Sequence, residues 1–315
     1  MKNKKNELIQ MAILFVLGIA VVLSSILPRI RIHNTLTTEP LEVSVIIREA
    51  DSSLWFNTRL GMEQAADELR VELRFLTLPQ ANDSKNQIRL LRREHAQGAD
   101  ALIIVPADPP RLMAALTEQD LGCPMVCMES QADWSSPFIA PDNAALGREL
   151  AMAALEDWRG GSFLLVNGCH SSTGLALRAE AAQQALLQAG VRVQLETAEK
   201  EGELRRLMEE TDASGIIVFE PALTEQAAAL KENLNSEQLL YGVGVTTAAA
   251  AYLERGTISA VAAWSDFVAG YLAVESAVHQ IKGSQYQVEP LPFFVVRGDE
   301  IYDPKYQKLL FPVMS

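Results

Sequence analysis

The chain has 315 residues, of which 49% are hydrophobic, 21% charged and 6% aromatic. This length favours about two domains, and the composition excludes a largely disordered or collagen-like chain. The formal net charge of −13 argues against a nucleic-acid-binding protein, because phosphate binding needs a basic face. The cysteines Cys123, Cys127 and Cys169 are too few for a disulfide framework, and we interpret them as buried free thiols.

Residues 1–31 predict a signal anchor. The run Ile9–Leu27 has no charged residue, and its nineteen residues would span about 28 Å as a helix, close to the thickness of a bilayer core. Three lysines precede the run, which favours a cytoplasmic amino terminus and an extracellular body. A cleaved signal peptide is the alternative, but its apolar region is normally shorter and ends in a small-residue cleavage site. We expect a single-pass protein of the cell membrane, or a secreted body if the segment is cleaved.

A polar linker at residues 32–41 precedes alternating strands and helices, which we infer from the spacing of apolar residues. In the first half, the expected strands are 43–48, 71–76, 101–105 and 124–128, and the expected helices are 58–69, 84–97 and 110–119. In the second half, the expected strands are 162–166, 191–196, 215–219, 239–243, 258–262 and 293–296, and the expected helices are 143–158, 175–189, 203–210, 224–233, 248–254 and 267–281.

This alternation indicates an α/β fold of βαβ units with parallel sheets, and its two consecutive runs predict two doubly wound lobes. In such sheets a ligand binds beyond the carboxyl ends of the strands. The loops of interest therefore follow Arg48, Val105, Val166, Phe219, Val243 and Ala262.

The chain carries no complete catalytic motif. The segment GVGVTT at 242–247 lacks the third glycine and the distant acid of a dinucleotide fingerprint, and a phosphate loop is missing. The loop 168–174 places Cys169 beside His170, but neighbours on a loop rarely point at each other, and we interpret its serines and threonine as a helix cap. The four histidines lack metal-ligand spacing. We expect a protein that is not an enzyme and needs no metal or cofactor.

Two tryptophans are candidate ligand contacts. Trp55 and Trp264 are both expected in loops at the carboxyl ends of strands. A planar indole offers an apolar face to a sugar ring or another flat ligand. Core packing is the alternative for each.

Five segments in order resemble the type I periplasmic-binding-protein family, the ribose/galactose type of extracellular sugar receptor. They are DSSLWFNTRLGMEQAADEL, ALIIVPADPPRL, IAPDNAALGREL, LERGTISAVAAWSDFVAGYLAVESAV and IYDPKYQKLLFPV, the last being similar to the tail of membrane-tethered Gram-positive members. The resemblance implies two Rossmann-like lobes that are joined by three crossovers and close on a ligand like a hinge. It implies 42–140 with 264–290 as lobe 1, and 141–263 with 291–315 as lobe 2 and the C-terminal tail.

The resemblance also implies a set of ligand-binding residues. They are Ser52, Ser53, Trp55, Asp108, Arg178, Glu220, Thr246 and Trp264. Ser52, Leu54 and Trp55 match the first ligand loop. Asp108 matches an acidic hydrogen-bonding residue, and Arg178 matches the arginine that clasps hydroxyls. Glu220 stands where Asn or Asp is usual, Thr246 where sugar binders usually have Asp, and Trp264 where they often have Gln. These departures weaken the case for a simple pentose or hexose, and an arginine paired with an acid could equally grip a carboxylate. Helix capping is the alternative for Asp108, and a solvated loop acid for Glu220.

We therefore expect a membrane-anchored extracellular solute-binding protein, monomeric, with a small polar ligand, a sugar or sugar-like compound, between its lobes. An ABC transporter permease or a sensor histidine kinase would read the closure, and nucleic acid is not an expected partner. An extracellular α/β enzyme is the first alternative. The core of a sugar-responsive repressor is the second, but a hydrophobic segment occupies the place of its helix-turn-helix.

Overall fold

The computed structural model describes residues 39–306, except 118–121, 133–134, 201, 245 and 285. The predicted signal anchor, most of the linker and the end of the tail lie outside the described residues. Within these ranges, no helix combines the length and the apolar character needed to cross a membrane. The helices and strands all belong to one compact unit, Leu41–Ser315.

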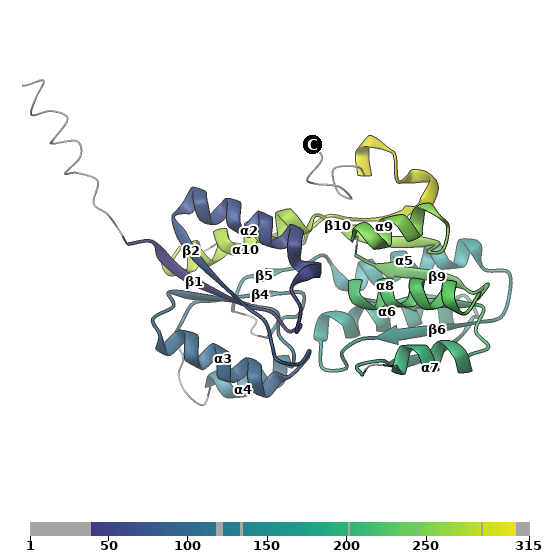
Figure 1. Cartoon of the computed structure of the whole chain (residues 1–315), viewed down its shortest axis with the longest axis horizontal. Coiled ribbons are helices and arrows are strands. Elements are labelled where there is room, and N and C mark those ends of the chain that lie inside the picture. Colours follow the sequence, from purple (N-terminus) through teal and green to yellow (C-terminus); the bar gives the residue numbers. More distant parts are fainter. Residues whose placement is uncertain are drawn as a thin grey trace, which may run out of the picture. The chain divides into compact units, whose positions relative to one another are not determined.

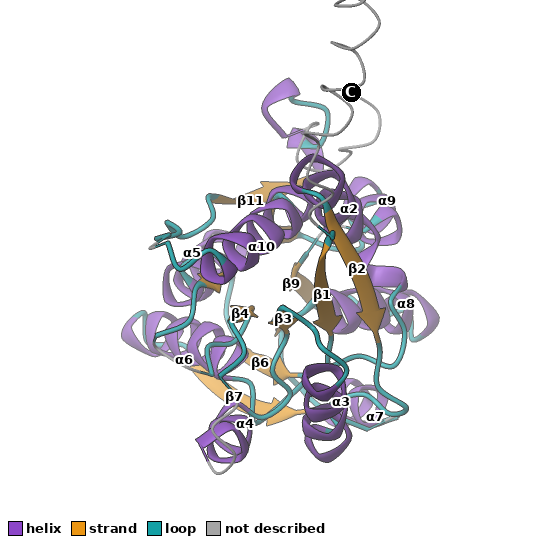
Figure 2. Cartoon of the chain, turned by 90° about the vertical axis from the view of Figure 1, so that its left-hand side faces the viewer, coloured by secondary structure: helices purple, strands orange, loops and turns teal. Residues whose placement is uncertain are grey.

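Lobe 1 is built on a five-stranded parallel sheet in the order β2-β1-β3-β4-β5. Its strands are β1 (Leu41–Ile46), β2 (Val71–Leu76), β3 (Ala101–Ile104), β4 (Met125–Met128) and β5 (Phe138–Ile139). Its helices are the 3-10 turn η1 (Ser53–Trp55), α2 (Phe56–Leu69), α3 (Ser84–Ala96), α4 (Pro109–Thr117) and, from late in the sequence, α10 (Asp266–Ile281). Helices α2 and α10 cover one face of this sheet, and α3 and α4 cover the other (Figures 1 and 2).

The two faces follow from the period of two along each strand. Val43 and Val45 of β1 pack in one core with Met62 of α2, whereas Ile46 packs in another core with Leu91 of α3. Every second side chain of a strand points to the same face. A strand that is apolar at nearly every position is therefore buried on both faces, as expected for a parallel sheet between two helix layers.

Lobe 2 is built on a six-stranded sheet in the order β11-β10-β9-β8-β6-β7. Its strands are β6 (Ser162–Asn167), β7 (Arg192–Thr197), β8 (Gly215–Val218), β9 (Leu239–Val243), β10 (Ala260–Trp264) and β11 (Phe293–Arg297). Only β11 is antiparallel to its neighbour in this sheet as described. Its helices are α5 (Asn143–Asp157), α6 (Thr173–Gln188), α7 (Glu203–Glu210), α8 (Pro221–Asn233), α9 (Thr247–Glu254) and the 3-10 turn η2 (Gly298–Glu300).

Both sheets repeat one topology, which determines where a ligand can bind. In each sheet the first strand lies between the second and the third, so the strand order reverses between β1 and β3 in lobe 1 and between β6 and β8 in lobe 2. Ligands of doubly wound sheets bind at such switch points, beyond the carboxyl ends of the strands. The chain passes between the lobes three times: after β5, after β10 and between α10 and β11.

The predicted two-lobed α/β fold is confirmed, with corrections to single elements. The strand expected at 258–262 is Ala260–Trp264, so Trp264 ends a strand instead of lying in the loop after it. The strand expected at 43–48 ends at Ile46, which leaves Arg48 in the following loop. Trp55 lies in the 3-10 turn η1, not in an irregular loop. The two-residue strand β5 was not predicted, because two residues carry no periodic pattern.

Candidate functional site

A cavity of about 530 Å³ lies where the two switch points face each other. Lobe 1 contributes the loop after β1, the start of α2 and the loop after β4, and lobe 2 contributes the loops after β6 and β8. Hydrogen bonds join the lobes beside it: the Ser130 and Ser172 hydroxyls lie 2.6 Å apart, and the Gly174 amide donates to Ser130 Oγ at 3.2 Å. The volume suits a small-molecule ligand, which usually occupies a cavity of about 300–1,000 Å³.

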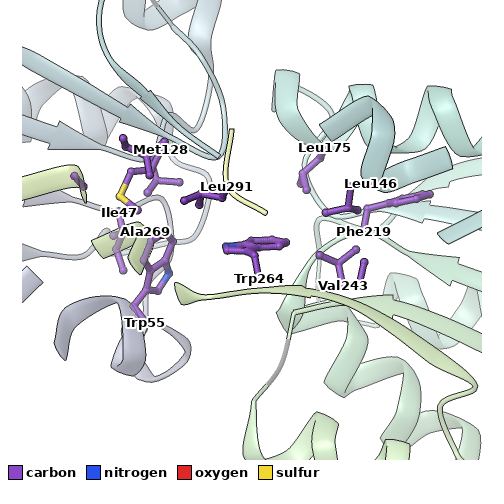
Figure 3. Packing of buried hydrophobic residues seen from close by; sticks show 14 of the residues in the cluster. Ile47, Trp55, Met128, Leu146, Leu175, Phe219, Val243, Trp264, Ala269 and Leu291 are labelled. Atoms are coloured by element: carbon purple, nitrogen blue, oxygen red, sulfur yellow. The ribbon is translucent and has the colours of Figure 1, made fainter. Parts of the chain in front are cut away.

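Two indoles belong to the apolar part of the cavity wall. Trp55 and Trp264 are each 8% exposed and both line the cavity. Trp264 ends β10 at the second crossover, and Figure 3 shows it between Met128 on the side of lobe 1 and Val243 on the side of lobe 2. The Trp55 indole N–H donates to Glu49 Oε2 at 3.1 Å, which fixes the orientation of its ring. The cavity thus offers flat apolar surfaces beside charged groups, a combination that suits a sugar ring.

Arg48 is the centre of the charged part of the cavity and connects the lobes. Its Nη2 donates to Glu220 Oε2 at 2.7 Å, across the cavity from lobe 1 to lobe 2. The same Nη2 lies 3.5 Å from Glu129 Oε2, and Nε lies 3.4 Å from Glu49 Oε1. Nη1 donates to Asn82 Oδ1 at 2.9 Å. One guanidinium therefore faces three carboxylates, all of which line the cavity.

The pKa values of this group reflect burial and crowding of charge. Burial lowers the pKa of Arg48, but Glu49, Glu220 and Glu129 outweigh burial and hold it well above its ordinary value. Burial raises the pKa of Glu49 to about 7, against the opposing effect of Arg48 and with added repulsion from Glu129 and Glu220. Charged forms lose hydration on burial, and like charges that lie close together resist ionisation. The cavity therefore holds more carboxylate than its arginine neutralises.

Arg178 lies behind the cavity wall and is fully buried. Its Nε donates to Asn143 Oδ1 at 2.7 Å, and Nη1 donates to the Phe219 carbonyl at 2.9 Å. Its guanidinium carbon lies 5.1 Å from the centre of the Trp264 ring. Burial lowers the pKa of Arg178, and Arg48 adds to that effect against the attraction of Glu129 and Glu220. This side chain supports the indole, and it does not line the cavity itself.

Asp266 is the acid of the cavity wall that stands without a direct partner. It is the first residue of α10, and its carboxylate has neither a hydrogen bond nor an ion pair within the described residues. Burial raises its pKa to about 7, helped by Glu129 and opposed by Arg178. Glu129 itself has φ of 59°, an uncommon left-handed conformation for a residue other than glycine. Such strained residues concentrate at functional sites.

The structure brings three of the eight predicted site residues to the cavity wall. They are Trp55, Glu220 and Trp264. The remaining five do not line the cavity: Ser52, Ser53, Asp108, Arg178 and Thr246.

Helix ends explain the positions of two of those five residues. The Asp108 carboxylate accepts from the Arg111 amide at the start of α4, and Thr246 caps α9 by accepting from the Ala249 amide. Ser53 donates to Asp51, and both residues are near the surface. A hydroxyl or carboxylate at a helix start accepts a hydrogen bond from an amide that has no partner in the helix. Helix capping was the alternative interpretation of Asp108, and its contact with Arg111 agrees with it.

Six charged residues of the cavity were not predicted: Arg48, Glu49, Glu129, Glu199, Lys200 and Asp266. The sequence did carry a signal for the first two, because the pair Arg48-Glu49 interrupts the apolar run of β1 at the carboxyl end of a strand. Asp266 follows Trp264 by two residues and also begins a helix next to a predicted site. The position of Glu129 depends on a left-handed backbone after β4, for which the sequence gives no comparable signal.

The loop with Cys169 and His170 behaves as a capped helix start. Ser172 caps α6 by accepting from the Leu175 amide, as predicted. Cys169 is buried, and its thiol donates to the Ala107 carbonyl at 3.5 Å, away from His170. His170 Nδ1 lies 2.7 Å from Glu199 Oε1, and its Nε2 lies 3.1 Å from Ser171 Oγ. The His170 side chain is 71% exposed. We therefore interpret its contacts with Glu199 and Ser171 as surface contacts that orient Glu199 at the edge of the cavity.

Comparison with known proteins identifies the relatives of this fold. A family profile described as a periplasmic binding protein domain matches residues 43–285. No curated protein sequence matches the chain. The glucose-galactose binding protein GanP of Geobacillus stearothermophilus is 20% identical, covers 84% of this chain and 100% of its own, and superposes with a TM-score of 0.75.

Two further solved structures show the same likeness. A carbohydrate transporter solute-binding protein of Agrobacterium radiobacter, in complex with D-arabinose, is 18% identical, covers 87% of this chain and 100% of its own, and has a TM-score of 0.78. A carbohydrate transporter protein of Acidothermus cellulolyticus, in complex with myo-inositol, is 17% identical, covers 83% of this chain and 96% of its own, and has a TM-score of 0.71. At these identities the likeness establishes the fold.

Proposed function

The chain belongs to the periplasmic binding protein domain family, and from this premise we propose that it is a membrane-anchored extracellular solute-binding protein whose ligand is a sugar or a sugar-like compound. The family is one of binding proteins, in agreement with the expectation that the chain is not an enzyme. The ligand would occupy the cavity between the lobes. Its capture would be read by an ABC transporter permease or by a sensor histidine kinase.

The observation that carries this proposal is the composition of the cavity wall. Two indoles from different elements, Trp55 and Trp264, line one space together with charged side chains of both lobes. Indoles accept the apolar face of a sugar ring, and carboxylates and guanidinium groups bind hydroxyls through charge-assisted hydrogen bonds. The structural neighbours with bound D-arabinose and myo-inositol carry polyhydroxylated ligands on the same fold.

A thermal-shift screen of the full chain in detergent micelles tests the proposal. The panel comprises sugars, polyols, nucleosides, amino acids and carboxylates. A ligand present at about 100 times its Kd stabilises the folded state by about 2.7 kcal/mol. Each kcal/mol raises Tm by about 2–4 °C for a chain of this size. We expect a rise of several degrees with one class of polyhydroxylated compound.

Trp55→Ala should abolish that shift, because it removes an indole from the cavity wall. Phe56→Ala is the matched control, since Phe56 is the next residue, is 58% exposed and does not line the cavity. A shift that survives in Trp55→Ala would place the ligand elsewhere. If no compound of the panel raises the Tm of the wild-type chain, the sugar assignment is refuted.

The anchoring part of the proposal rests on the sequence. Residues 1–31 contain a long uncharged apolar run behind three lysines, a pattern that retains a protein in the membrane with its body outside. A tether keeps the binding protein beside one partner, which favours the sensor role slightly over import. Alkaline extraction of the membrane fraction tests the anchor, because an integral protein stays in the pellet and a secreted body is released.

A further inference from the structure

The cavity carries an excess of negative charge. Besides Glu199 at the rim, four carboxylates line it, from Glu49, Glu129, Glu220 and Asp266. Arg48 is the only arginine among the described lining residues. At the rim, Glu199 and Lys200 add one charge of each sign. The wall thus contains more carboxylates than cations.

The two arginines do not balance these acids. Arg48 donates at 2.7 Å to Glu220 alone, and its contacts with Glu129 and Glu49 are longer, at 3.5 and 3.4 Å. Among the described residues, Arg178 donates to two neutral oxygens, of the Asn143 amide and the Phe219 carbonyl, and its buried Nη2 has no hydrogen-bond partner there. Glu129 is left with one long contact, and Asp266 has no direct partner within the described residues.

Glu129 and Asp266, the two acids without a close partner among the described residues, line the same cavity as the two indoles. Asp266 follows Trp264 by two residues, and Glu129 lines the same cavity as both of them. The faces of indole rings attract cations, most strongly where water is excluded. A positive centre between Glu129 and Asp266 would therefore be stabilised by both carboxylates and by an indole.

A metal ion does not fit this place. Among the residues that the structure describes, no group of three or more His, Cys, Asp or Glu side chains is arranged to hold one. An organic cation, which needs no such group of ligands, fits the two carboxylates better. In a cavity built for a polyhydroxylated ligand, the group that satisfies two carboxylates and an indole is a protonated amine on the sugar.

This inference rests on the proposed function: we propose that the ligand is an amino sugar and that Glu129 and Asp266 bind its ammonium group. The hydroxyls of the ring bind Arg48 and Glu220, and the apolar face of the ring lies against an indole. This assignment accounts for the excess of acids, which a neutral sugar would leave unbalanced.

Isothermal titration of the full chain in detergent micelles at pH 7.0 tests the assignment. The probes are D-glucosamine and D-galactosamine, each compared with its neutral parent sugar and with its N-acetyl derivative. We expect each amino sugar to bind about tenfold more tightly than both counterparts, the factor that one charge-assisted hydrogen bond supplies. The neutral sugars bind weakly but measurably, because they share the ring contacts.

Asp266→Asn separates the charge from the shape of the site. It should weaken amino-sugar binding about tenfold more than it weakens the binding of neutral sugars. Asp67→Asn is the matched control, because Asp67 is exposed on α2 outside the cavity. Glu129→Gln is the second variant if Asp266→Asn fails to fold, and the same selective loss is expected.

The outcomes distinguish this inference from the proposed function. Equal affinity for amino and neutral sugars would overturn the inference and leave the sugar-binding proposal standing. An equal loss for both sugar classes in Asp266→Asn would also overturn it. Failure of every sugar to bind the wild-type chain would overturn the proposed function and the inference together.

Discussion

Asp266 links the charge of the cavity to the pH dependence of stability. Its pKa of about 7 lies far above the value of about 4 for an unfolded Asp. Between these values the folded chain binds a proton that the unfolded chain has lost. Since stability falls with rising pH wherever the folded state binds more protons, Asp266 lowers the free energy of unfolding as the pH rises through this window.

Asp266→Asn removes this titration. We expect the Tm of the variant to exceed that of the wild type by a margin that widens from pH 5 to pH 8, measured by thermal denaturation of the ligand-free chain. Groups with lowered pKa values, such as Asp157, titrate equally in both proteins and cancel in the comparison. Parallel Tm curves would show that the Asp266 carboxyl is ionised normally in the folded state.

At the scale of the residue, the sequence predicted the aromatic part of the site better than the charged part. Trp55, Trp264 and Glu220 were predicted and line the cavity. Arg48 was assigned to the end of a strand, whereas β1 ends at Ile46 and the guanidinium reaches across to lobe 2. The partners of an arginine that bonds to a residue 172 positions away depend on tertiary structure, which a local pattern does not contain.

At the scale of the element, two glycines control how α2 packs against α10, which lie side by side in Figure 1. A Cβ at Gly61 would lie 1.9 Å from the Phe267 carbonyl oxygen, and a Cβ at Gly270 would lie 1.9 Å from that of Thr58. Helix propensity alone predicts that Gly→Ala stabilises a helix by about 1 kcal/mol. A clash with backbone opposes this gain, because overpacking costs about 1–3 kcal/mol and the backbone has to shift.

We therefore expect Gly61→Ala to lower Tm by several degrees and to weaken ligand binding, because Thr58 of α2 and Asp266 and Ala269 of α10 line the cavity. Thermal denaturation and titration with the identified ligand measure the two effects. Gly122→Ala is the control, since a Cβ there meets no atom within 4 Å. A gain in Tm for Gly61→Ala would mean that the helices separate without cost and that propensity dominates.

Most elements were predictable because each contains a full period of its pattern. The expected ranges 71–76, 203–210 and 239–243 agree with β2, α7 and β9 to the residue. The predicted range of β10, 258–262, begins two residues too early. Ile258 is apolar and buried like the residues of the strand, so the apolar pattern does not mark the true start at Ala260. That shift matters for the site, since it moves Trp264 from a loop to the end of a strand.

At the scale of the whole molecule, alternation of strands and helices predicted two doubly wound lobes, and the resemblance implied their crossovers. The sequence pattern did not predict the contacts that hold the lobes together, because these contacts join loops that are distant in the sequence. One of them is the ion pair of Arg48 with Glu220, at 2.7 Å and with both side chains at most 10% exposed. Removing one partner of a buried ion pair is strongly destabilising, since the other charge remains buried.

Arg48→Gln should therefore part the lobes. Without the guanidinium, Glu49 and Glu129 of lobe 1 face Glu220 of lobe 2, and the like charges repel each other across the cavity. Small-angle scattering of the compact unit Leu41–Ser315 should give a larger radius of gyration for the ligand-free variant than for the ligand-free wild type. Arg74→Gln is the matched control, because Arg74 pairs with Glu42 and Glu94 inside lobe 1 and should leave the radius unchanged. An unchanged radius in Arg48→Gln would assign the closure to the serine contacts between Ser130 and Ser172 instead.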